Sequence, residues 1–342
     1  MRRKGTSLLL AAIFIAFASF SLQAQEDLQA EYDQKLQKAN EIRAQMGEAG
    51  IAADEYEKLK EQYEQLNQEI KELQAKLLED AEYQKRMNQS KQAFNEGNTA
   101  YKKGQYEEAL NQYNKAVELN ENYDDAYYGK GLTMLKLRRY EDAIAAFQHV
   151  VEVNPSHSRA FSAMGSAYNR LGRKQQAIEA YQNAIEIDQS LYTTMYNLGL
   201  VYNNIKNWEN AIKYFRMATT VNSDYYKAYN SLGVALSGAG RLEDAIMAFQ
   251  NALAIDEDYT SARYHLAEAL NKAGQHEQAL TEARKAAADR SRYKAAAHFE
   301  AGKALQTMGR LSEALSEFEK AANDRRWRKA AQYEIDTIKR QL

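Results

Sequence analysis

The strongest constraint on the fold of this chain is an internal repeat with a period of 34 residues. A small residue recurs at one offset in six successive units, as Gly97, Gly131, Gly165, Gly199, Gly233 and Ala267. The same period aligns an alanine column, Ala109, Ala143, Ala177, Ala211, Ala245 and Ala279. It also aligns an aromatic column, Tyr113, Phe147, Tyr181, Phe215 and Phe249, which ends at Ala283. Three independent columns with one period predict stacked structural units, none of which buries its apolar face alone.

The composition points to helices as the content of each unit. The 342 residues include one proline, Pro155, and no cysteine. A chain with almost no proline and with helix-forming residues at most positions is predicted to be all-α. The absence of cysteine excludes disulfides and thiolate metal sites.

The repeated columns have a simple packing explanation. A glycine or alanine in the first helix of a unit lets the second helix approach closely. The aromatic residue lies four positions after the alanine, on the same face of the second helix, where it fills space between units. A further set of glycines is expected to end the first helices as C-terminal caps: Gly104, Gly172, Gly240, Gly274 and Gly309.

These columns resemble the tetratricopeptide repeat, a helix–turn–helix unit. The fourth unit matches its signature positions at Met195, Leu198, Gly199, Tyr202, Ala211, Phe215 and Ala218. The resemblance implies a right-handed α-solenoid of about seven units and a capping helix over 329–342, apolar at Ala330, Tyr333 and Ile338. The units are expected over 90–123, 124–157, 158–191, 192–225, 226–259, 260–294 and 295–328, the sixth with one inserted residue.

Residues 25–89 show a different pattern, that of a coiled coil. Apolar residues spaced alternately by three and four form a seam suited to a partner helix: Tyr56, Leu59, Tyr63, Leu66, Ile70, Leu73 and Leu77. Gly47 and Gly50 interrupt the pattern upstream, and Asp54 could cap the second helix. Three alternatives remain open: a helical hairpin, a long helix that forms a homo-oligomer through residues 56–77, and a solvated spacer.

The first 24 residues are typical of an export signal. Arg2, Arg3 and Lys4 precede a short apolar run, and Ala24 ends a plausible cleavage site. We therefore expect a periplasmic protein, with an uncleaved membrane anchor as the alternative. The formal net charge of the whole chain is -2, and removing the three signal cations makes it more negative. An acidic protein offers no electrostatic basis for nucleic-acid binding.

No set of residues suggests catalysis. The five histidines fall at unrelated repeat positions and at no metal-ligand spacing. The glycines recur once per unit, as packing requires, and form no phosphate-binding loop. We expect no enzyme activity, no cofactor and no metal.

The resemblance implies a concave groove, lined by the first helices, that binds a peptide or a helix of a partner protein. Tyrosine gives large contact area at low entropic cost, and asparagine both donates and accepts hydrogen bonds. The candidate partner-binding residues are Tyr128, Asn169, Arg170, Tyr196, Asn197, Asn203, Lys227, Asn230, Tyr264 and Asn271.

The C-terminal region is basic. Residues 284–342 hold 14 basic and 8 acidic residues, among them the run Arg325–Lys329. This region could contact an acidic partner or an anionic membrane, or it is only solvated.

The layout as a whole is similar to that of the periplasmic coiled-coil and tetratricopeptide cell-division coordinator of the Tol system. We therefore expect a protein-interaction scaffold in cell-envelope assembly or division. The alternative is a recruiter of a secretion or cell-wall enzyme that binds peptide or glycan in the groove.

Overall fold

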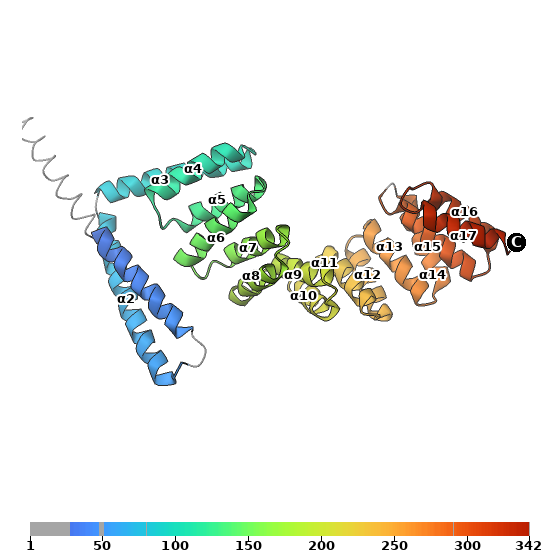
Figure 1. Cartoon of the computed structure of the whole chain (residues 1–342), viewed down its shortest axis with the longest axis horizontal. Helices are drawn as coiled ribbons and strands as arrows, with labels where there is room; N and C mark the ends of the chain where they lie inside the picture. The colour runs from blue at the N-terminus through green and yellow to red at the C-terminus, as the bar shows by residue number, and fades with distance from the viewer. Residues whose placement is uncertain (1–27, 48–50, 80, 290, 342) are drawn as a thin grey trace, which may run out of the picture. The chain divides into compact units, whose positions relative to one another are not determined.

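The computed structural model describes residues 28–47, 51–79, 81–289 and 291–341. The expected signal peptide and residues 48–50 of the glycine interruption lie outside this range. Every regular element among the described residues is a helix, as the composition predicts (Figure 1). The chain divides into two compact units, Met1–Thr133 and Met134–Leu342, which we describe separately.

The first unit begins with two helices packed against each other, one over 28–46 and α2 (Ala53–Glu79). Ala39 and Ile42 of the first helix form a buried cluster with Leu66 and Ile70 of α2. An ion pair of 2.8 Å joins Lys35 Nζ to Glu69 Oε2. The described residues thus correspond to the hairpin alternative, and self-association through residues 56–77 stays a prediction.

Two details of the coiled-coil interpretation are wrong. The heptad pattern predicts Tyr56 in the seam, but its side chain is 38 % exposed, because it lies before the stretch of α2 that contacts the first helix. Asp54 lies inside the first turn of α2, which begins at Ala53, so it is not the N-cap residue.

The rest of the first unit contains α3 (Ala81–Lys102), α4 (Tyr106–Leu119) and most of α5 (Asp124–Lys136), which crosses the division. The Tyr113 ring of α4, 1 % exposed, lies between glycines of the two flanking helices. A Cβ added at Gly97 or at Gly129 would approach this ring to 2.8 Å or 2.7 Å. The ring therefore occupies the space that both glycines leave open.

The second unit is a row of helix pairs, in which the first helices of successive repeats are α7, α9, α11, α13 and α15 (Figure 1). The bounds are α6 (Tyr140–Val153), α7 (Ser158–Arg170), α8 (Lys174–Ile187), α9 (Tyr192–Asn204), α10 (Trp208–Val221), α11 (Tyr226–Gly238), α12 (Leu242–Ile255), α13 (Thr260–Lys272), α14 (His276–Ala288), α15 (Lys294–Thr307), α16 (Leu311–Ala322) and α17 (Arg328–Lys339).

The glycine and aromatic columns meet inside each helix pair of the second unit. A Cβ on Gly199 would lie 2.6 Å from Phe215 Cε1, and one on Gly233 would lie 2.5 Å from Phe249 Cε1. The two rings are at most 1 % exposed. Each glycine is therefore required because a fully buried ring fills the position of the missing side chain.

The turn that ends each first helix uses a left-handed residue. Gly172 and Gly240 have φ of 75° and 78°, as the predicted caps require. At the same repeat position, Arg138 and Lys206 adopt φ of 59° and 58°. The sequence analysis missed these two residues, whose side chains make this backbone conformation costly.

The last helix, α17, packs on α16 through Ala331, Ile335 and Ile338, which are at most 4 % exposed. The expectation for Ile338 is confirmed, whereas those for Ala330 and Tyr333 are wrong. Ala330 is exposed and Tyr333 is 67 % exposed. The buried residues recur at spacings of four and three, and this stripe passes one position after Ala330.

Candidate functional site

The predicted partner-binding residues all lie on first helices. In the second unit, two are on each of α7, α11 and α13 and three are on α9, namely Asn169, Arg170, Lys227, Asn230, Tyr264, Asn271, Tyr196, Asn197 and Asn203. Tyr128 lies on α5 in the first unit and is half-buried. We therefore treat the second unit as one candidate surface.

Tyr196 and Tyr264 each pack against a tyrosine that immediately precedes the next first helix. The ring centroids of Tyr196 and Tyr225 are 5.1 Å apart, and those of Tyr264 and Tyr293 are 5.3 Å apart. Tyr225 and Tyr293 are the N-cap residues of α11 and α15. Each such pair of aromatic rings stabilises the fold by about 0.5–1.5 kcal/mol more than the burial of its apolar area alone.

This N-cap column is a structural feature of the candidate surface that the sequence analysis missed. It contains Tyr123, Tyr225, Tyr259 and Tyr293, all separated by multiples of the repeat period. The period was visible, but the partner of each ring lies in another repeat, so the pairing could not be read from local sequence.

Seven tyrosines of the second unit pack on one another in three groups, and we name them together the tyrosine patch: Tyr192, Tyr196, Tyr225, Tyr226, Tyr259, Tyr264 and Tyr293. Tyr225 also contacts Tyr192 at 5.2 Å, and Tyr226 contacts Tyr259 at 4.8 Å, both measured between ring centroids. All seven side chains are half-buried, so each ring is fixed by packing while part of it stays accessible.

Burial disfavours ionisation of three hydroxyls of the tyrosine patch, because it raises the pKa of Tyr225, Tyr259 and Tyr264. Burial raises the pKa of Tyr225 to about 12, and the neighbouring Tyr196 and Tyr192 add to this effect. Burial, followed by the carboxylates of Glu268 and Glu300, also raises the pKa of Tyr264. Neutral phenols both donate and accept hydrogen bonds, which suits a polar ligand without a strong charge.

The asparagines predicted for this surface differ in availability. Asn271 is 9 % exposed, and its Nδ2 donates to the Glu300 backbone oxygen and to Glu300 Oε2, both at 2.9 Å. This amide therefore links α13 to α15 and is engaged within the chain. Asn230 is 7 % exposed, and its Oδ1 has no hydrogen-bond partner among the described residues, as is also true of Asn203 Oδ1.

The remaining predicted residues are more accessible. Arg170 and Lys227 are exposed, and Asn169 and Asn197 are half-buried. Lys227 Nζ lies 5.8 Å from the centroid of Tyr226, so one cation of the chain already borders the tyrosine patch.

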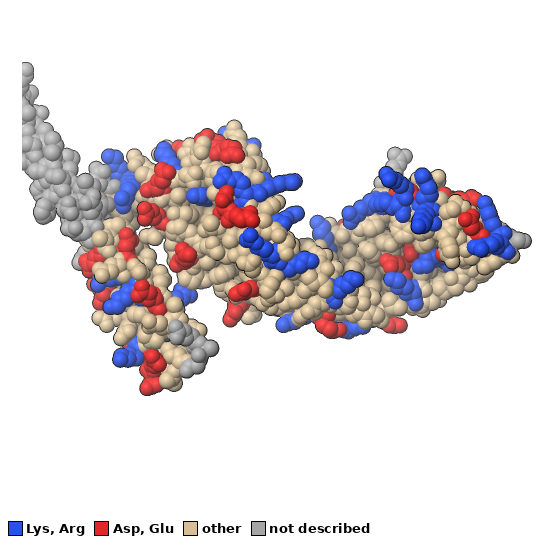
Figure 2. All heavy atoms as spheres, in the orientation of Figure 1, with Lys and Arg blue, Asp and Glu red and all other residues tan. Residues whose placement is uncertain are grey.

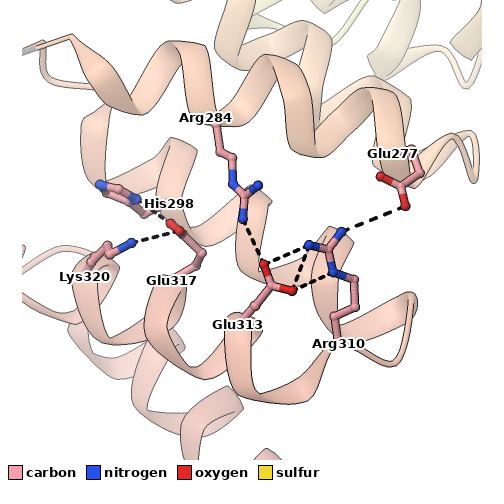
Figure 3. Close-up of polar contacts among 7 residues, drawn as sticks. All are labelled: Glu277, Arg284, His298, Arg310, Glu313, Glu317 and Lys320. Carbon is pink, nitrogen blue, oxygen red and sulfur yellow. Dashed lines mark hydrogen bonds and ion pairs between the residues drawn. The ribbon is translucent and has the colours of Figure 1, made fainter.

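A second group of polar residues lies between α14, α15 and α16 (Figure 3). The Glu313 carboxylate accepts from Arg284 at 3.2 Å and from Arg310 at 2.8 Å. Glu317 contacts His298 Nδ1 at 2.7 Å and accepts from Lys320 at 2.9 Å. These contacts join helices where Ala283 replaces the aromatic residue of the column, and we assign them a structural role.

The electrostatics of Glu317 agree with this structural role. Burial opposes ionisation of this carboxyl, but the hydrogen bonds from His298 and Lys320 outweigh it and lower its pKa to about 2. Within 28–47, 51–79, 81–289 and 291–341, no cluster of histidine, aspartate and glutamate could hold a metal ion. In the same ranges, none of the helices has the length and apolar character needed to cross a membrane.

Comparison with known protein families identifies the repeat. A model described as TPR repeat matches residues 97–138, and three described as tetratricopeptide repeat match 133–191, 190–258 and 236–296. Together they span more than half of the chain. Among curated proteins, none matches this sequence.

Solved structures show the same architecture. The C-terminal part of a TPR repeat-containing protein from Cytophaga hutchinsonii has a TM-score of 0.60 at 19 % identity, covering 71 % of this chain and 99 % of its own. A tetratricopeptide repeat protein from Parabacteroides merdae has a TM-score of 0.52 at 14 % identity, covering 73 % and 99 %. The MamA protein is 27 % identical with a TM-score of 0.46, covering 49 % and 92 %. The chain belongs to the tetratricopeptide-repeat family.

Proposed function

We propose that this protein is an exported, non-enzymatic scaffold that binds a peptide or helix of a partner protein on the tyrosine patch. Proteins built from tetratricopeptide repeats generally mediate protein–protein interaction, and the packed rings of the patch support it as the binding surface in this chain. The observation that carries the proposal is the fixed row of half-buried tyrosines over α9, α11, α13 and the start of α15.

The physical chemistry of the patch favours a protein segment. Rings that are already packed lose little side-chain entropy on binding, so their contact area contributes to affinity. The neutral hydroxyls and the amides of Asn169 and Asn197 can pair with the donors and acceptors of a peptide backbone. A set of this kind concentrates binding energy in a few aromatic residues.

We place this activity in the cell envelope, in assembly or division. The support is the basic start, short apolar run and Ala24 of the N-terminus. Intact-mass measurement of the protein exported by its native cell should give a mature N-terminus at Gln25. Recovery of a full-length membrane-embedded form would instead support an uncleaved anchor.

Cross-linking pull-down from the native envelope tests the binding function. The Tyr196→Ala variant should lose the partner that the unaltered protein captures, because this ring packs on Tyr225 within the patch. The matched control is Tyr333→Ala, which removes a 67 % exposed tyrosine outside the patch. Equal capture by both variants would contradict the proposal. Retention on isolated cell-wall fragments, lost with Tyr196→Ala, would favour the glycan-binding recruiter instead.

A further inference from the structure

The connections that precede the first helices differ in charge along the second unit. The connection before α13 is acidic, with Asp256, Glu257 and Asp258. The two connections that follow at the same structural position, before α15 and α17, hold more cations than carboxylates when counted with the first turns that they enter, and their acidic residues are Asp289 and Asp324. Their exposed cations, which we name the basic patch, are Arg292, Lys294, Arg325, Arg326, Arg328 and Lys329. Figure 2 shows lysine and arginine side chains gathered at this end of the chain, over α15 to α17.

Direct contacts bring the two basic connections together. The Arg326 guanidinium donates to the backbone oxygen of Arg292 at 3.2 Å. Among the described residues, Asp324 is the one carboxylate that forms an ion pair with a cation of this patch, at 2.9 Å from Arg326. Hydrogen bonds from the side chain and backbone of Arg326 lower the pKa of Asp324 to about 2. The like charges of the other cations repel one another, and a bound anion would relieve this repulsion.

The basic patch adjoins the tyrosine patch. The Arg292 guanidinium donates to the Tyr293 hydroxyl at 2.7 Å and lies 4.9 Å from the ring centroid. Tyr293 in turn stacks with Tyr264 at 5.3 Å. A segment bound along the tyrosine patch therefore reaches arginine side chains where the patch ends.

We propose that the partner segment continues into a stretch of aspartate or glutamate that binds the basic patch. This inference rests on the proposed function, because it identifies the chemistry of the same partner. Four of the six cations are arginines, whose planar guanidinium pairs with carboxylates in two-point geometry. Arg326 already forms this arrangement with Asp324, through Nε at 3.1 Å and a terminal nitrogen at 2.9 Å.

A membrane surface fits these observations less well than a protein carboxylate. Stable peripheral membrane binding usually combines cations with apolar side chains that enter the lipid. The large aromatic residue within the basic run, Trp327, is half-buried and packs on Phe299 with ring centroids 4.9 Å apart. Its position favours a structural role in the last connection.

Fluorescence anisotropy of a labelled octaglutamate peptide on the full-length protein tests the inference. We expect binding that weakens as salt is raised. It should fall about tenfold in the triple variant Arg292→Gln, Arg325→Gln, Arg328→Gln, which leaves the Arg326–Asp324 pair intact. The matched control removes three exposed cations elsewhere in the second unit, through Lys174→Gln, Lys206→Gln and Arg216→Gln. This control should change the affinity less than twofold.

Equal loss in the two triple variants would overturn the inference, because it would show a response to net charge only. Vesicles of phosphatidylcholine and phosphatidylglycerol form the other arm of the test. If the first triple variant abolishes vesicle binding and leaves octaglutamate binding unchanged, the patch binds membranes and the inference is wrong. Partner capture that depends on Tyr196 but not on the three arginines would overturn it while the proposed function stands.

Discussion

The substitution Gly233→Ala has two opposing effects on stability, a gain in helix propensity and a clash with the ring of Phe249. Replacing Gly233 by alanine should stabilise α11 by about 1 kcal/mol through helix propensity. The new Cβ, however, would lie 2.5 Å from Phe249 Cε1 and 2.7 Å from two further ring atoms. Carbon atoms in contact prefer about 3.5–4.0 Å, so the ring would have to move by about 1 Å.

The Phe249 ring has no free space to move into, because it is 1 % exposed. Overpacking of this kind costs about 1–3 kcal/mol or more. We therefore expect Gly233→Ala to lower the free energy of unfolding by up to about 2 kcal/mol in the unaltered protein. In the background of Phe249→Ala, which itself costs about 3–5 kcal/mol, the same change should stabilise by about 1 kcal/mol. The next repeat has this combination naturally: Ala267 stands in the glycine column where Ala283 replaces the aromatic ring, and both are 0 % exposed. An alanine is therefore tolerated at this position when the ring is absent.

Urea unfolding followed by far-UV circular dichroism measures both effects. The comparison uses the unaltered protein, Gly233→Ala, Phe249→Ala and the double variant. It is valid only if the dependence of the unfolding free energy on urea concentration is the same in all four, because repeat arrays can lose cooperativity. Ala267→Gly, in the repeat that lacks the aromatic ring, should cost about 1 kcal/mol of helix propensity and about 0.8 kcal/mol for the buried methyl group that it removes. If Gly233→Ala stabilises the unaltered protein, the ring is free to move and the packing explanation of the glycine column is refuted.

Three further predictions concern other parts of the chain. Lys206→Gly should raise the free energy of unfolding by up to about 1 kcal/mol, because Lys206 has a left-handed φ of 58°. Gly240→Ala should lower it, because Gly240 has a φ of 78°. Equal melting temperatures of the two variants and the unaltered protein would contradict this. The Glu317 carboxyl has a pKa of about 2 in the folded chain against an ordinary value of 4.5, so its ionised form stabilises the fold above about pH 4.5. This contribution, at most about 3 kcal/mol, is lost as the pH falls towards 2. Urea midpoints measured between pH 5 and 3 should therefore fall more steeply in the unaltered protein than in Glu317→Gln, and parallel slopes would contradict this. Removing residues 28–79 should leave the number of chains per particle in light scattering unchanged if these helices pair only within one chain, as the burial of Ile70 indicates. Loss of a dimer would instead support the alternative of a homo-oligomer through residues 56–77.

The sequence by itself determined the repeating element and its internal packing. A glycine and an aromatic ring that meet within one helix pair are separated by a fixed short distance in the chain, as Gly199 and Phe215 are. Their pairing therefore follows from the period and from the volume of the ring. The left-handed turns followed in the same way wherever glycine marked them, and were missed where Lys206 takes the same backbone conformation.

Only the tertiary structure decided which side chains stay available at the surface. Asn271 and Asn203 occupy the same repeat position, but Glu300 of the next first helix engages the Asn271 amide alone. Tyr225 was not identified as part of the site because its ring meets Tyr196 across the junction between repeats. On α17, apolar residues occur on more than one face, and packing on α16 selects Ala331 over Ala330 and Tyr333. In each case the deciding contact joins residues of different repeats, and a repeat period specifies what recurs without specifying what each recurring side chain meets.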